Sequence, residues 1–197
     1  MKKMMILGFS FFFSGCSLFL PVSTPIHQHY MLEQLPSVSP HFSRHPKILM
    51  IMFPQTNPAY DTNQIAYASQ KWQINYFSKN AWAMKPADMF YILMIQTLQQ
   101  SKHFRAVIGP AFVGHQDVIL NTWIMELRED TTQPLPTFNI SLQAVLTDAT
   151  TNQIIATKNF HEEIPLSNSS VQSAVNAANQ AVAIILRKLS QFCVTKI

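Results

Sequence analysis

The sequence predicts an α+β fold in which two amphipathic helices cover mainly one face of an antiparallel or mixed β-sheet. Residues 138–147 alternate between apolar and polar side chains, as a half-buried strand does. Strand-like segments at 117–128 and 153–164 flank this strand across short polar links, which favours an antiparallel meander. Residues 82–102 and 168–192 repeat their apolar side chains at helical spacing. Strands grouped with two such helices indicate a layered α+β domain.

Both helical segments begin with residues suited to a helix start. Pro86 fits the first turn of the first helix, where its missing N–H is not needed. Asn168 or Ser169 can cap the second helix by accepting a hydrogen bond from a backbone N–H. The second helix carries a continuous apolar stripe of Val171, Val175, Ala178, Val182, Ile185 and Leu189. We therefore expect Val182, near the centre of the stripe, to be buried.

The N-terminal half of the chain predicts shorter strands. The nearly apolar run at 47–53 ends at Pro54, as a buried strand bounded by proline does. Further strands are predicted at 27–35, 64–68, 71–77 and 105–108. The segments at 64–68 and 71–77 are close enough to form a hairpin.

The first residues have the pattern of an export signal. Lys2 and Lys3 precede an apolar run at 4–13, which ends in small residues and Cys16. The run is shorter than the ~20 residues that a membrane-spanning helix needs. An ordinary signal peptide or a short membrane anchor is the alternative to a lipoprotein signal.

The tetrad Phe13-Ser14-Gly15-Cys16 resembles the bacterial lipobox, with Phe13 in place of the usual leucine. The resemblance implies cleavage before Cys16 and acylation of that cysteine. Several acyl chains anchor firmly because each buried methylene contributes ~0.8 kcal/mol. The predicted organisation is a signal peptide at 1–15, a lipidated tether at 16–26 and a single domain at 27–197. By resemblance to bacterial sorting rules, Ser17 favours the periplasmic face of the outer membrane.

The charge content argues against a nucleic-acid partner, and the cysteine content excludes an internal disulfide in the mature lipidated chain. Removing Lys2 and Lys3 lowers the basic residues from 14 to 12, against 10 acidic residues, and the net charge from +4 to +2. The remaining bases are scattered, so no nucleic-acid partner is predicted. In the mature lipidated chain Cys193 has no second thiol with which to pair. We expect it to be a small buried hydrophobic residue; a disulfide with another molecule is the alternative.

The sequence predicts no catalytic residue, no metal site and no cofactor besides the covalent lipid on Cys16. Gly109 and Gly114 are the only glycines after residue 15, so a phosphate-binding loop and a nucleophile elbow are both missing. A zinc site needs three or four ligands with supporting partners. The candidate histidines, which we expect to lie at the surface, are His27, His29, His41 and His45.

Two other groups have structural interpretations. His161-Glu162-Glu163 near the end of a strand is expected to be a solvated edge and not an acid/base site. Met50, Met52 and Met94 are expected to fill the core and not to line a lipid groove.

The order of several short motifs resembles the ABC-type transport auxiliary lipoprotein family over about residues 27–190. The motifs are the apolar strand ending at Pro54, then Tyr60, Asn63-Gln64-Ile65-Ala66-Tyr67, Tyr76-Phe77, Asn80-Ala81-Trp82-Ala83 and Gln153-Ile154-Ile155-Ala156. The leucine usual after the tyrosine and the arginine frequent after the Gln-Ile segment are absent. The resemblance implies a non-enzymatic component of an intermembrane lipid transport system, working with an ABC permease, its ATPase and a periplasmic protein with mammalian-cell-entry (Mce) domains.

The partner surface is expected to include exposed aromatic residues, because aromatic side chains are enriched at interfaces. The candidates are Tyr60, Tyr67 and Trp72, for which core packing is the alternative. The sequence leaves homo-oligomer formation open. The alternative function is a ligand-binding or enzymatic periplasmic lipoprotein of unknown substrate.

Overall fold

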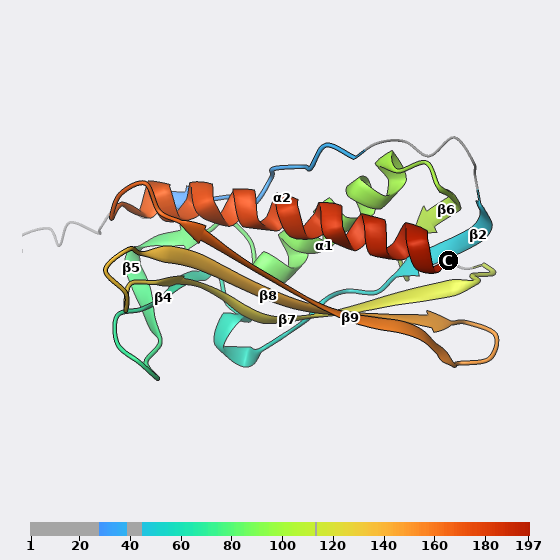
Figure 1. Ribbon diagram of the computed structural model, residues 1–197, viewed down its shortest axis with the longest axis horizontal. Helices are drawn as coiled ribbons and strands as arrows, with labels where there is room; N and C mark the ends of the chain where they lie inside the picture. Colours follow the sequence, from blue (N-terminus) through green and yellow to red (C-terminus); the bar gives the residue numbers. More distant parts are fainter. Residues whose placement is uncertain (1–27, 39–44, 113) are drawn as a thin grey trace, which may run out of the picture.

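A computed structural model describes residues 28–38, 45–112 and 114–197, and in these residues two helices lie on one face of a mixed sheet (Figure 1). The predicted α+β class is confirmed. The strands are β1 (Gln28–Tyr30), β2 (His45–Ile51), β3 (Gln55–Thr56), β4 (Gln64–Ala68), β5 (Asn75–Trp82), β6 (Phe104–Ile108), β7 (Val118–Asp130), β8 (Thr137–Asp148) and β9 (Ile154–Pro165). The helices are α1 (Pro86–Gln100), α2 (Val171–Lys196) and the short 3-10 helix η1 (Pro58–Tyr60).

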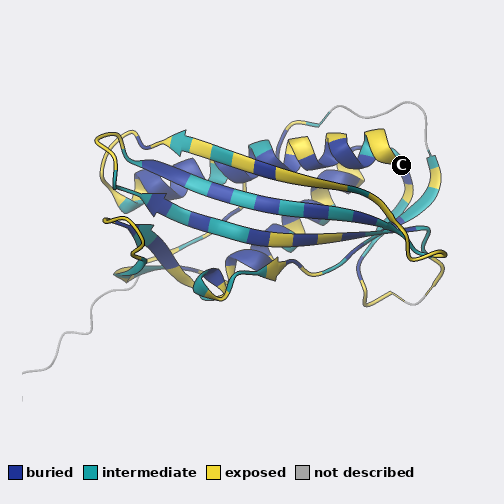
Figure 2. Cartoon of the chain, turned by 60° about the horizontal axis from the view of Figure 1, so that its bottom comes forward, coloured by how far each residue is buried: buried dark blue, intermediate teal, exposed yellow. Residues whose placement is uncertain are grey.

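The three long strands β7, β8 and β9 form the predicted antiparallel meander. Alternate side chains of β8 are buried beneath the helices; they are Phe138, Ile140, Leu142, Ala144 and Leu146. The residues between them are less buried, and Figure 2 shows this alternation on the face that the helices leave open. The period of two in the sequence thus predicted both the strand and its buried face.

β7 organises the rest of the sheet. Its second edge pairs in succession with β2, β3 and β4, all three of them parallel to it. β6 then adds parallel to β2, β5 adds antiparallel to β4, and β1 adds parallel to β5. The sheet is therefore mixed, which the sequence had left open.

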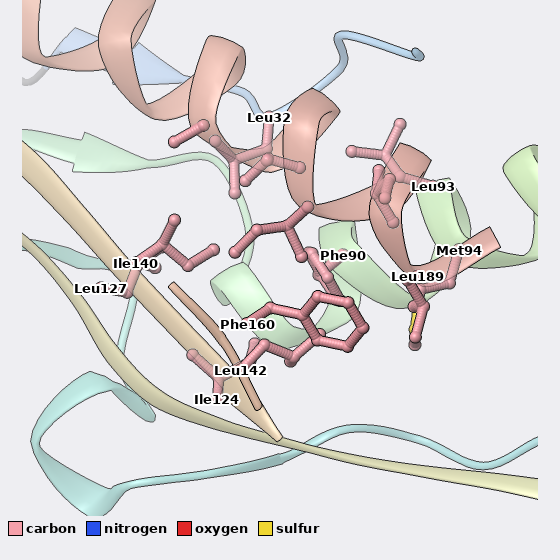
Figure 3. Packing of buried hydrophobic residues seen from close by; sticks show 14 of the residues in the cluster. Leu32, Phe90, Leu93, Met94, Ile124, Leu127, Ile140, Leu142, Phe160 and Leu189 are labelled. Carbon is pink, nitrogen blue, oxygen red and sulfur yellow. The ribbon is translucent and has the colours of Figure 1, made fainter. Parts of the chain in front are cut away.

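The core lies between the sheet and the helices. α2 packs on β8 and β9 and also contacts α1. Figure 3 shows side chains from these layers in one cluster, among them Phe90 of α1, Leu142 of β8 and Leu189 of α2. Val182 and Cys193 are both fully buried, as expected. No helix in the described ranges is long and apolar enough to cross a bilayer.

The α2 cap lies one residue beyond the two predicted positions. The side chain of Ser170 caps the helix by accepting a hydrogen bond from the N–H of Ser173, at 3.2 Å. Asn168 instead accepts a hydrogen bond from the N–H of Ser170, at 3.0 Å. It therefore supports the cap without forming it.

The predicted start of the first helix at Trp82 is wrong. Trp82 is the last residue of β5, and its N–H donates to the carbonyl of Asn63 at 2.6 Å. Only 1% of Trp82 is exposed because its ring lies in the core, and β5 extends as far as this residue. The helix begins at Pro86, which occupies the predicted first turn.

The second hairpin strand starts at Asn75 instead of residue 71, because residues 69–74 form the turn.

The strand predicted at residues 27–35 is much shorter in the structure. β1 is only three residues long, and the chain after it is held to α2 by Asn179. The side-chain oxygen of Asn179 accepts from the N–H groups of Glu33 and Gln34, and its amide nitrogen donates to the carbonyl of Met31. His27, the predicted first residue of that strand, lies outside the described residues.

In β7 an irregularity between Ile124 and Glu126 shifts the register. Leu127 consequently returns to the core side, although simple alternation placed it opposite Ile124. Trp123 stays on the open face and is 44% exposed, so that face is not fully covered.

Candidate functional site

The three aromatic residues predicted to bind a partner occupy different environments. Tyr60 is 8% exposed, and burial raises the pKa of its phenol. Tyr67 is half-buried, with its ring centroid 4.7 Å from that of Phe77. Trp72 is 92% exposed. Partner binding by this set stays a prediction, and Trp72 is the member that presents its whole ring to solvent.

Trp72 owes its exposure to the turn between β4 and β5. Its φ angle is 65°, a left-handed conformation that costs a residue with a Cβ about 1–2 kcal/mol. The N–H of Gln73 donates to the carbonyl of Gln70 across the turn, at 3.2 Å. The ammonium of Lys71 lies 4.7 Å from the centroid of the Trp72 ring. A cation and an aromatic ring therefore stand together at the tip of the hairpin.

A second exposed apolar side chain belongs to the turn between β7 and β8. Leu135 in this turn is 60% exposed. The two turns are neighbours because β4 and β7 run parallel, with Ala68 beside Asp130. The N–H and hydroxyl of Thr131 both donate to the carbonyl of Ala68, at 2.8 and 3.0 Å. We call residues 69–74 and 131–136 together the turn surface.

The open face of the sheet contains a hollow of about 280 Å³. Its lining is Met52, Phe53, Gln55, Asn121, Thr122, Trp123, Gln143 and Val145. Phe53 is 58% exposed and stacks on Tyr91, with 4.1 Å between the ring centroids. Together with the half-exposed ring of Trp123, this stack gives the hollow an aromatic rim.

The two aromatic residues of the hollow, Phe53 and Trp123, were not predicted as site residues from the sequence. Phe53 was assigned to a buried strand, but β2 ends at Ile51 and leaves Phe53 beyond it. The signal in the sequence is Pro54, which has no N–H to donate to a sheet and so limits strand pairing beside it. Trp123 lies between Thr122 and Ile124, both buried, so strict alternation places it on the opposite face.

Polar side chains bond to one another across the open face beyond the hollow. The guanidinium of Arg128 lies 2.8 Å from the carboxylate of Glu126 and 3.5 Å from that of Asp130. The hydroxyl of Ser141 and a ring nitrogen of His161 are 2.8 Å apart. The contact between Ser141 and His161 joins β8 to β9. One guanidinium faces two carboxylates, so this part of the face is a polar surface with a small net negative charge.

Comparison with known proteins identifies the family. The sequence profile described as ABC-type transport auxiliary lipoprotein component matches residues 30–190. The chain belongs to this family. The predicted resemblance is therefore confirmed. No curated protein matches the sequence.

Two crystal structures share the fold of this auxiliary lipoprotein component. Protein XCC0632 from Xanthomonas campestris is 18% identical, with a TM-score of 0.79, and the match covers 86% of this chain and 96% of that one. An uncharacterized protein is 14% identical, with a TM-score of 0.69, and the match covers 85% of this chain and 99% of that one. At these identities the two structures show the fold alone.

The described part of the auxiliary lipoprotein component contains no group of three or more histidine, cysteine or acidic residues that could hold a metal ion. His29 is exposed on β1, and His45 stacks on His103 with 5.8 Å between ring centroids. His27 and His41 lie outside the described residues. Of the three methionines expected in the core, Met94 is fully buried, whereas Met50 is half-buried and Met52 lines the hollow.

Proposed function

We propose that this auxiliary lipoprotein is a non-enzymatic component of an intermembrane lipid transport system, held by lipid on Cys16 at the periplasmic face of the outer membrane. The observation that carries the proposal is the family match over residues 30–190. The lipobox-like tetrad ending at Cys16 supports the anchor. Transport fits this design because a lipid does not cross an aqueous gap unaided, so a channel or shuttle needs a docking point on the receiving membrane.

The proposed partner is a periplasmic Mce-domain protein that works with an ABC permease and its ATPase. The aromatic rim of the hollow is the surface that we assign to this contact. Phe53 and Trp123 expose large rings that lose little conformational entropy when covered, and such rings are frequent at the centres of interfaces. The polar side chains beyond the hollow, around Arg128, would then lie at the solvent-exposed edge of this interface.

The test is capture of the Mce-domain protein by the purified, detergent-extracted lipoprotein. Phe53→Asp and Trp123→Asp are each expected to weaken capture at least tenfold, because a central interface aromatic contributes about 2 kcal/mol or more. Phe112→Asp is the matched control, since Phe112 is 66% exposed outside the hollow. If the wild type captures no component of the transporter although its melting temperature is normal, the adaptor function is wrong.

The hollow also favours a second candidate function, binding of a small apolar ligand. Its volume of about 280 Å³ is close to the lower end of the ~300–1,000 Å³ typical of ligand sites. A ligand-binding lipoprotein should bind a small apolar fluorescent probe such as N-phenyl-1-naphthylamine with a stoichiometry of one per chain, and Trp123→Asp should abolish this binding. Saturable binding of that kind without partner capture would favour the second function over the first.

A further inference from the structure

The turn surface lies at one end of the domain, opposite the chain's C-terminus. The N–H of Leu166, just before α2, donates to the carbonyl of Pro136, so α2 begins beside the β7–β8 turn. α2 then runs for 26 residues, about 39 Å, away from this end. Figure 1 shows β4 and β5 at one end of the molecule and the C-terminus at the other. Trp72 and Leu135 therefore project from the end at which α2 starts.

The first residue of β1 also faces this end. β1 runs parallel to β5, with Gln28 beside Asn80 and Tyr30 beside Trp82. β5 itself runs away from the β4–β5 turn, because it starts at Asn75 directly after that turn. Gln28, the first described residue, therefore lies at the end of β1 that faces the side on which Trp72 lies.

The length of the predicted tether limits which end of the domain can reach the membrane. Residues 17–27 separate Cys16 from Gln28, and twelve steps of extended chain span at most about 40 Å. This reach is about the length of α2. The far end of the domain could touch the membrane only with the tether stretched along the whole molecule. The turn surface needs only about half of this reach, because Gln28 lies beside Asn80, five residues or about 17 Å along β5 from Asn75.

The chemistry of the turn surface fits a phospholipid surface. Lys71 is the only charged residue in residues 69–74 and 131–136. The adjoining carboxylate of Asp130 accepts hydrogen bonds from the N–H and hydroxyl of Thr132, and the guanidinium of Arg128, 3.5 Å away, offsets its charge. The α2 N-terminus nearby adds a partial positive charge and has no acidic residue in its first turn. Tryptophan prefers the membrane–water interface, and a lysine beside it attracts anionic lipid.

We propose that the turn surface rests on the bilayer that holds the anchor, with Trp72 and Leu135 among the lipid headgroups. This inference rests on the proposed anchor at Cys16. It assigns Trp72 to lipid, in place of the partner contact that the sequence predicts for this residue, and assigns the Mce-domain partner to the hollow on the open face. The lipid anchor and the turn surface together fix the orientation of the domain. The open face of the sheet is then not in contact with the bilayer and stays accessible to a protein partner.

The test uses the full lipidated chain reconstituted into vesicles of phosphatidylethanolamine and phosphatidylglycerol, with and without bromine on the acyl chains. Bromine quenches tryptophan fluorescence at short range. We expect brominated vesicles to quench the wild type and Trp123→Phe, and to lose most of this effect on Trp72→Phe. Both substitutions keep an aromatic ring at an exposed site, so equal melting temperatures should confirm that the fold is intact.

The outcomes separate this inference from the proposed function. Flotation of the chain with the vesicles reports the anchor, and partner capture in detergent reports the hollow. A chain that floats but is not quenched, or whose quenching survives Trp72→Phe, overturns the inference and leaves the proposed function standing. Loss of partner capture by Trp72→Phe without lipid quenching overturns it as well and gives Trp72 to a protein partner. A chain that does not float removes both the anchor and the inference.

Discussion

The carboxylate of Asp117 accepts a hydrogen bond from the backbone N–H of Ile48, at 2.7 Å. The N–H of Asp117 in turn donates to the carbonyl of Ile48, at 3.0 Å. One residue thus joins the start of β7 to β2 through both its backbone and its side chain. The hydrogen bond from Ile48 is the main reason that the pKa of Asp117 is lowered, and His115 adds to the effect.

Replacing Asp117 should therefore destabilise the protein in a pH-dependent way. Asp117→Ala is expected to lower the free energy of unfolding by about 1–2 kcal/mol at pH 7, because the N–H of Ile48 loses its acceptor. The pKa of Asp117 is lower in the folded state than in the unfolded state. Its contribution is therefore complete above the unfolded value of about 3.9 and is lost as the pH falls through the folded value.

Urea denaturation of wild type and Asp117→Ala at pH 7 and at several lower pH values measures this effect. Glu163→Ala, at an exposed site on β9, is the matched control and should change little. A difference between wild type and Asp117→Ala that stayed constant well below pH 3.9 would exclude the carboxylate as its source.

Cys16→Ala should leave the protein without lipid, because the lipobox resemblance places the acyl chains on that residue. Cells grown with radiolabelled palmitate should label the wild type and not the variant. Cys193→Ser is the control and should label normally, since the Cys193 side chain is completely buried. Equal labelling of Cys16→Ala and wild type would remove the anchor and the membrane assignment that depends on it.

Val182→Asp should destabilise the fold severely. Val182 is fully buried, so the substitution places an unpaired carboxylate against the sheet, at a cost of several kcal/mol. Gln180→Asp introduces the same group at an exposed position of α2 and should change the melting temperature by only a few degrees. Similar melting temperatures for the two variants would contradict the packing of α2 described above.

The thiol of Cys193 should be unreactive in the native protein. Burial raises its pKa strongly, so little thiolate exists at neutral pH, and the side chain is shielded from reagents. A maleimide should label the native lipidated chain very slowly and label one thiol per chain in denaturant. Rapid native labelling, or a dimer that disappears on reduction, would instead support the disulfide with another molecule.

The parts of the fold that sequence analysis predicted correctly are those governed by local periodicity. The alternation along β8 and the apolar stripe of α2 are each long enough to identify an element and its buried face. The parallel stacking of β2, β3 and β4 along one edge of β7 was not predictable, because it depends on pairing between distant segments. Trp82 shows the same limit, since its place in β5 depends on its fit in the core and not on its neighbours in sequence.

The candidate sites divide in the same way. The family was predicted correctly from the order of several motifs. Lipidation of Cys16, which a contiguous motif predicts, stays a prediction. The stack of Phe53 on Tyr91 joins two residues far apart in the chain, and neither stands out in sequence. Trp72 was predicted as a candidate because it is aromatic. Its exposure depends on its left-handed backbone conformation, which the sequence does not indicate because the turn contains no glycine.

The attachment of β1 has a mechanical consequence under the proposed anchor at Cys16. A pull on Gln28 acts along the axis of β1, and its bonds to β5 resist in shear, so they must yield together instead of unzipping one at a time. Beyond them, the amide of Asn179 ties the chain at Met31, Glu33 and Gln34 to α2. Tension applied at Gln28 would therefore pass into both the sheet and the longest helix, and the domain would bear this load without its edge strand separating from the sheet.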